Sequence, residues 1–182
     1  LVPGPGDCLI GGRVMITPAY VRTMAAYNRE MNERLYAAAA RLTDAERRGD
    51  QGAFWGSVHG TFSHLLWGDS IWLSRFSDWP KPAVGLKESA GMVEDFAELA
   101  AARERLDAAI SAWAAGMDEA WLALDQTWIN SAGRERTGPR ALLVAHMFNH
   151  QTHHRGQAHA LLTRAGEQTG DTDLSILVPA IV

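Results

Sequence analysis

The stretch HMFNHQTHHRGQ, residues 146–157, holds four of the seven histidines of the chain. It lies in a periodic apolar segment that predicts a helix over residues 139–165, with Gly166 as its stop. On a helix, His150 and His154 are one turn apart on one face, so both imidazoles can bind a single ion. Because two nitrogens do not complete a metal site, a third ligand must come from another segment.

His64 is the best placed third ligand. It lies in the apolar run TFSHLLWGDSIWL, residues 61–73, inside a second predicted helix over residues 54–76. If the two helices are neighbours, His64 can meet His150 and His154 near the middle of both. A lone histidine on an apolar face is more often a hydrogen-bonded core residue. The histidine pair on the other helix is therefore what favours metal binding.

Two further segments have apolar residues at a helical period of about 3.6, with charged residues on the opposite face. One covers residues 18–42 and follows Thr17, a typical N-cap residue. The other covers residues 89–117, with Arg103 and Arg105 assigned to its outer face. Both segments are long enough to extend along the whole length of a small domain.

The connections between these helices carry signals of their own. Thr43 and Glu46 have the spacing of a capping box and predict one turn of helix. Residues 118–138 predict a short irregular or hairpin segment before the fourth helix, turning at Gly133. Four long amphipathic helices predict an all-α four-helix bundle, in which facing helices supply the side chains of metal sites.

The composition excludes several classes of protein. A length of 182 residues fits one domain, and a formal net charge of −4 offers no basic surface for nucleic acid. No apolar run approaches the roughly 20 residues that cross a bilayer, and no export signal is evident, so we expect no membrane association. The single cysteine, Cys8, fits a reducing compartment, and we expect a cytoplasmic location.

The two ends of the chain differ from the rest. Residues 1–14 contain six glycines or prolines and no initial methionine, which predicts a disordered leader or a non-native remnant without regular structure. We therefore expect a single metal-binding domain over residues 15–182. The tail, residues 174–182, is too apolar to remain in water, so we expect it to dock on the bundle or on a partner chain.

The patterns HLLxxDxxW at residues 64–72 and NHxxHHRGQ at 149–157, together with Tyr27-Asn28, resemble the DinB/YfiT-like family of metalloenzymes. The resemblance covers most of residues 15–166, and HxxxHRGQ is its most specific motif. One departure is Glu30, where family members frequently have an aromatic residue. The family's name refers to damage-inducible expression and not to the translesion DNA polymerase of the same name.

The resemblance implies a four-helix bundle, often homodimeric, with one divalent metal ion held by His64, His150 and His154. Nickel or zinc is the common ion, and iron or manganese also fits imidazole ligands. The related enzymes of known activity are metal-dependent transferases and isomerases that use a low-molecular-weight thiol as co-substrate. Such a thiol is therefore the co-substrate that the resemblance implies for this chain.

Other polar residues of the fourth helix have several readings. Gln157 lies about 20° from His150 in projection, where its amide is placed to orient a ligand or a bound substrate as an assisting catalytic residue. His146 lies one turn before His150. Three roles stay open for it: it could support a ligand, line a pocket or serve as a fourth ligand. His153 points about 100° away from His154, which favours packing or a dimer contact.

Four residues outside this set are not expected to bind the ion. His59 and His159 have no partner at useful spacing and are expected to be structural or exposed. Gly156 is interpreted as a close-packing point between helices. Asp69 points about 140° away from His64 and is not expected to be a ligand.

A site of three neutral imidazoles leaves coordination positions for water or substrate, as in catalytic zinc sites. Water or a thiol bound there loses its proton near neutral pH, which supplies a nucleophile without a separate base. We expect an enzyme acting on a small-molecule substrate, either a thiol-dependent transferase or isomerase or, alternatively, a metal-dependent hydrolase. A non-catalytic, stress-related metal-binding protein stays open as a second class, with a saturated ion that only joins two helices.

Overall fold

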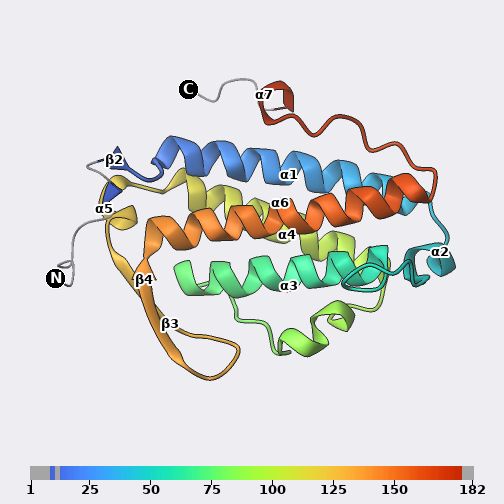
Figure 1. Ribbon diagram of the computed structural model, residues 1–182, viewed down its shortest axis with the longest axis horizontal. Helices are drawn as coiled ribbons and strands as arrows, with labels where there is room; N and C mark the ends of the chain where they lie inside the picture. The colour runs from blue at the N-terminus through green and yellow to red at the C-terminus, as the bar shows by residue number, and fades with distance from the viewer. Residues whose placement is uncertain (1–8, 11–12, 178–182) are drawn as a thin grey trace.

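The computed structural model describes residues 9–10 and 13–177. Four long helices make up most of it and lie side by side (Figure 1). Helix α1 packs against α4 and α6, and α3 packs against the same two helices, so the four surround one core. The predicted all-α fold is confirmed. The four helices are α1 (Pro18–Ala40), α3 (Val58–Phe76), α4 (Phe96–Ala115) and α6 (Arg140–Arg164).

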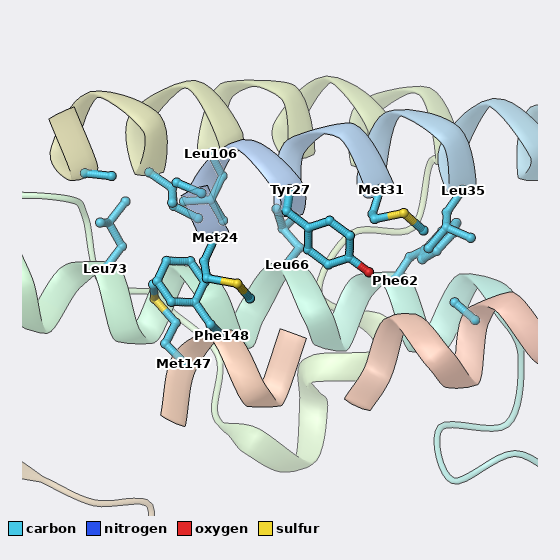
Figure 2. Close-up of a cluster of buried hydrophobic side chains, with 14 of the residues drawn as sticks. Met24, Tyr27, Met31, Leu35, Phe62, Leu66, Leu73, Leu106, Met147 and Phe148 are labelled. Atoms are coloured by element: carbon cyan, nitrogen blue, oxygen red, sulfur yellow. The ribbon is translucent and has the colours of Figure 1, made fainter. Parts of the chain in front are cut away.

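The core between the helices is built from large apolar side chains of all four (Figure 2). Tyr36 of α1 stacks on Phe62 of α3 with ring centroids 4.2 Å apart. No helix among the residues that the structure describes is long and apolar enough to span a membrane. The labelled core residues are Met24, Tyr27, Met31, Leu35, Phe62, Leu66, Leu73, Leu106, Met147 and Phe148.

Capping side chains set where two helices begin, and both predicted starts were too early. Helix α3 begins at Val58 because the Ser57 hydroxyl accepts a hydrogen bond from the backbone N–H of Gly60. Helix α4 begins at Phe96 because the Asp95 carboxylate caps it. The expected start at residue 89 falls instead in a short 3₁₀ helix, η1 (Leu86–Gly91).

The short connections follow the sequence signals closely. Thr43 and Glu46 form the predicted capping box at the start of α2 (Asp44–Arg48). After α4 come α5 (Glu119–Leu122) and an antiparallel hairpin of β3 (Asp125–Ile129) and β4 (Glu135–Pro139). The hairpin turns at Gly133, whose φ of 72° favours glycine. The predicted hairpin before the fourth long helix is thus present.

Both ends of the chain lie partly outside the described residues, namely 1–8, 11–12 and 178–182. Within the segment expected to lack regular structure, β1 (Leu9–Ile10) pairs antiparallel with β2 (Arg13–Val14). The segment after α6 runs alongside α1 and leads to α7 (Leu174–Leu177), which is the described part of the tail (Figure 1). The Tyr27 hydroxyl donates a 2.7 Å hydrogen bond to the carbonyl of Thr172 and fixes this segment to the bundle.

Candidate metal centre

Helices α3 and α6 are neighbours, and they bring together the three histidines that the sequence singled out. His64 comes from α3, and His150 and His154 come from successive turns of α6. One ring nitrogen from each lies within 4.8 Å of the others. The Nε2 atoms of His64 and His150 are 3.4 Å apart. The three imidazoles therefore converge on one point between the two helices.

This spacing fits a metal ion. In a tetrahedral zinc site with Zn–N bonds of about 2.0–2.1 Å, the ligand nitrogens lie about 3.3–3.4 Å apart. The separation of 3.4 Å between His64 Nε2 and His150 Nε2 agrees with that value. With an ion present, both nitrogens would direct a lone pair at it, whereas without one the contact is a long hydrogen bond whose direction depends on the tautomers.

Burial keeps these imidazoles neutral, which metal binding requires. His64 is 2% exposed and His154 is 6% exposed. Burial, followed by the positive charge that His154 would carry, lowers the pKa of His64 to about 3. Burial and the neighbouring histidines also lower the pKa of His150 to about 3. Burial likewise lowers the pKa of His154. Protons therefore compete with an ion for these nitrogens only in acid.

Ser89 of η1 fixes which nitrogen of His64 is free. Its hydroxyl donates a 2.7 Å hydrogen bond to the carbonyl of Leu86, so it accepts from Nδ1–H of His64 at 2.8 Å. The proton on Nδ1 leaves the lone pair on Nε2, the atom that faces His150. Ser63 of α3 holds Ser89 in place by donating to its carbonyl at 2.8 Å.

Gln157 performs the corresponding role for His154. Its Oε1 accepts a 2.7 Å hydrogen bond from His154 Nδ1, while its amide nitrogen lies 3.3 Å from His153 Nε2. This orientation of the amide satisfies both contacts. Gln157 was expected from its position on the helix to assist the site. It binds Nδ1 of His154 and leaves the other ring nitrogen, Nε2, free.

Gly68 allows His150 to approach α3. A Cβ atom at Gly68 would lie 2.6 Å from Cε1 of His150, closer than real Cβ contacts allow, and 3.2 Å from its Nδ1. At Gly156, which the sequence suggested as the close-packing point, an added Cβ would meet nothing within 4 Å. That interpretation was wrong, since Gly156 is exposed on the outer side of α6.

Gly68→Ala is expected to push His150 away from His64 and to lower the divalent-metal affinity by about tenfold or more. The bundle should remain folded, because the displaced ring is at the edge of the core. Elemental analysis after dialysis and thermal melting measure the two effects. The matched control is Gly156→Ala, which should retain the metal and gain roughly 0.5–1 kcal/mol of helix stability. Undiminished metal binding by Gly68→Ala would contradict this reading of the contact.

Trp55 covers one side of the cluster. It lies in the segment between α2 and α3, where Gly56, with a φ of 76°, turns the chain. The indole stacks on the His64 imidazole with ring centroids 3.8 Å apart and an interplanar angle of 19°. The sequence carried no signal for this contact, because nothing in the residues preceding α3 indicates how they fold back over it.

The other histidines take separate roles. His146 lies outside the three-histidine group and meets the Trp72 ring edge-on at 5.1 Å, where it lines a pocket. His153 is exposed and contacts Gln157. His59 is buried, with its Nε2 2.7 Å from the carbonyl of Val93. His159 Nδ1 lies 2.5 Å from the Thr169 hydroxyl.

A buried polar network contains three further residues of the motifs, Asn28, Asp69 and Arg155. Asp69 accepts a 2.6 Å hydrogen bond from Arg103, which also donates to Asp107 at 2.7 Å. Asn28 donates to Asp107 at 3.0 Å and accepts from Arg155. Asp69 is thus outside the three-histidine group, as expected. Arg103 was predicted to face outward, and this was wrong, because it is only 2% exposed. The network joins α1, α3, α4 and α6.

The fold and the site together define a class, an all-α protein with a largely buried three-histidine cluster that could hold a metal ion. The chain belongs to the DinB family, whose sequence model matches residues 15–178. No curated protein and no solved structure matches the chain. The family resemblance drawn from the motifs is therefore confirmed.

Proposed function

We propose that this protein is a divalent-metal-dependent enzyme whose ion is held by His64, His150 and His154. The observation that carries the proposal is the convergence of three imidazoles from two helices, two of them buried and one half-buried, whose pKa values are lowered by burial. The hydrogen bonds that His64 and His154 donate to Ser89 and Gln157 leave the inner nitrogen of each ring free. Such support is typical of metal ligands.

An ion held by three imidazoles keeps positions for water or substrate and lowers the pKa of what binds there. The residues around the cluster orient the histidine rings and shield them from solvent. Ser89 and Gln157 hold two rings in one orientation, and Trp55 shields His64 from solvent on one side. Nickel or zinc is the proposed ion, and iron or manganese also fits the imidazole set.

The activity that we propose is a thiol-dependent transfer or isomerisation on a small molecule, the activity found among related enzymes. A pocket of about 360 Å³ that includes His150 supports an enzyme over a purely structural metal site. A metal-dependent hydrolase is the alternative within the enzymes. A non-catalytic, stress-related metal-binding protein is the alternative outside them. We further propose a homodimer, because proteins of the resembled family often form one. The proposed location is the cytoplasm.

Cobalt-substituted protein tests the thiol. Addition of mycothiol, bacillithiol or glutathione is expected to shift the visible absorption bands of cobalt, because a thiolate replaces an oxygen or nitrogen donor. The same shift is expected for His153→Ala, since His153 lies outside the three-histidine group. His64→Ala should bind little cobalt and show no such bands. Unchanged bands with all three thiols, together with turnover of an ester or amide without thiol, would replace this proposal by the hydrolase.

A further inference from the structure

The pocket beside the histidine cluster has walls from four elements. They are the second half of α3, η1 through Leu86, the β3–β4 hairpin and the first half of α6. His150 belongs both to the pocket and to the cluster. A small molecule in the pocket therefore lies next to the proposed ion.

Aromatic side chains make up much of the pocket wall. Trp72 and Trp128 have ring centroids 6.1 Å apart, and His146 meets Trp72 edge-on at 5.1 Å. The indole N–H of Trp67 donates a 2.9 Å hydrogen bond to the carbonyl of Val84, which fixes that ring. Rigid aromatic walls of this kind suit the flat apolar body of a ligand.

Arg75 brings an uncompensated positive charge to the same pocket. Its guanidinium lies 4.3 Å from the centroid of the Trp72 ring. Among the described residues it forms no ion pair, and its one hydrogen bond is a 3.4 Å contact with the carbonyl of Ile129. Burial lowers the pKa of Arg75. A partly buried guanidinium with free donors favours an anionic ligand, above all a planar carboxylate that it can bind with two hydrogen bonds.

Asn130, at the hairpin turn, offers a second donor. Its Oδ1 accepts hydrogen bonds from the backbone N–H groups of Ala132 and Arg134, both at 3.0 Å. The amide nitrogen has no partner among the described residues, and Asn130 lines the pocket together with Arg75. Arg75 lies about two turns of α3 beyond Gly68, which contacts His150, so these donors from α3 and the hairpin lie at the end of the pocket away from His150.

The surroundings of this end are positively charged. An adjoining cavity of about 640 Å³ shares Arg75 and Asn130 with the pocket. Its wall adds Lys81, Lys87 and Glu88. Two lysines and one arginine against one glutamate leave a local excess of positive charge on a chain whose formal net charge is −4. Such a field attracts anions to the pocket.

We infer that the substrate is a carboxylate with a flat apolar body, bound with its carboxylate on Arg75 and its body against Trp72 and Trp128. Its identity as a substrate, and not merely a ligand, rests on the proposed function. Arg75 would be the residue that selects acids over their neutral analogues, and the opposite end of the molecule would point towards His150.

Calorimetric titration with 1-naphthoate and its neutral analogue 1-naphthamide tests this inference on the metal-loaded protein. The carboxylate is expected to bind about tenfold more tightly than the amide. Arg75→Met should abolish that preference by weakening naphthoate alone, and Arg75→Lys should retain part of it. The matched control is Arg140→Met, because Arg140 lies over Trp121 in the same manner, at 4.5 Å, outside the pocket.

Two results would overturn the inference. One is equal affinity for naphthoate and naphthamide. The other is a preference for naphthoate that survives in Arg75→Met, which would place the carboxylate on the ion itself. The metal content of each sample, determined in parallel, separates this inference from the proposed function. If the protein binds no metal but prefers naphthoate through Arg75, only the proposed metal-dependent enzyme is refuted. If it binds metal but shows no such preference, only the acid-binding pocket is refuted.

Discussion

His150→Ala is expected to lower the affinity of the protein for its divalent ion by about a hundredfold or more. Loss of a residue that merely supports a ligand costs about 10–100-fold, and His150 is proposed to be a ligand itself, with its Nε2 3.4 Å from that of His64. Wild-type protein should carry about one ion per chain after purification. Elemental analysis after dialysis against a weak chelator measures the difference.

The same substitution should remove the stabilisation that the ion confers. A ligand at a hundred times its dissociation constant stabilises the folded state by about 2.7 kcal/mol. Wild-type protein should therefore melt several degrees higher with metal than with chelator, whereas His150→Ala should melt alike in both. The control is His153→Ala, which alters the same helix outside the three-histidine group. Full metal occupancy in His150→Ala would refute the assignment.

Helical periodicity predicted the three-histidine cluster once the two helices were taken as neighbours, and the family motif named the same three residues. His150 and His154 had to share a face of α6, and the apolar run around His64 placed that residue inside the bundle. The close approach at Gly68 could not be predicted in this way. A glycine within a helix carries no local sign of what lies opposite, and only the packing of α3 on α6 brings His150 against it.

Ser89 shows a second limit of sequence reasoning. The residues around it predicted a helix start, yet Asp95 makes the stronger cap and Ser89 turns towards His64, 25 positions earlier in the chain. A hydrogen bond between residues so far apart leaves no periodic signal. The residues that support the three histidines therefore emerged from the structure, although the histidine cluster itself could be predicted.

Arg103 was misplaced for a related reason. A long charged side chain in an amphipathic helix ordinarily lies on the solvent side, so its neighbour Arg105 was assigned to the same outer face. The sequence does contain partners for a buried arginine, namely Asp107 four residues later in the same helix and Asp69 on α3. Periodicity assigns a face to each helix separately and cannot pair charges across the core.

Arg103→Leu is expected to lower the free energy of unfolding by about 3–5 kcal/mol, because removal of one partner leaves buried charges uncompensated. Arg103 lies 2.6 Å from Asp69 and 2.7 Å from Asp107, and all three side chains are at most 4% exposed. Urea unfolding at neutral pH measures the loss. Arg105→Leu, an exposed position on the same helix, is the matched control and should change stability by no more than about 0.5 kcal/mol.

The pH dependence of the stability lost in Arg103→Leu distinguishes two causes, namely buried carboxylates left without a positive partner and the loss of side-chain packing. Burial raises the pKa of Asp69 and of Asp107, and the charge of Arg103 opposes the rise. Without Arg103 both pKa values should rise further above the unfolded value of about 4. A carboxyl group whose pKa is higher in the folded than in the unfolded protein destabilises the folded state at pH values above the unfolded pKa. This destabilisation disappears as the pH falls and the group becomes protonated in both states. The penalty of Arg103→Leu should therefore shrink as the pH falls from 7 towards about 4. A penalty that stays constant over that range would assign the effect to packing alone.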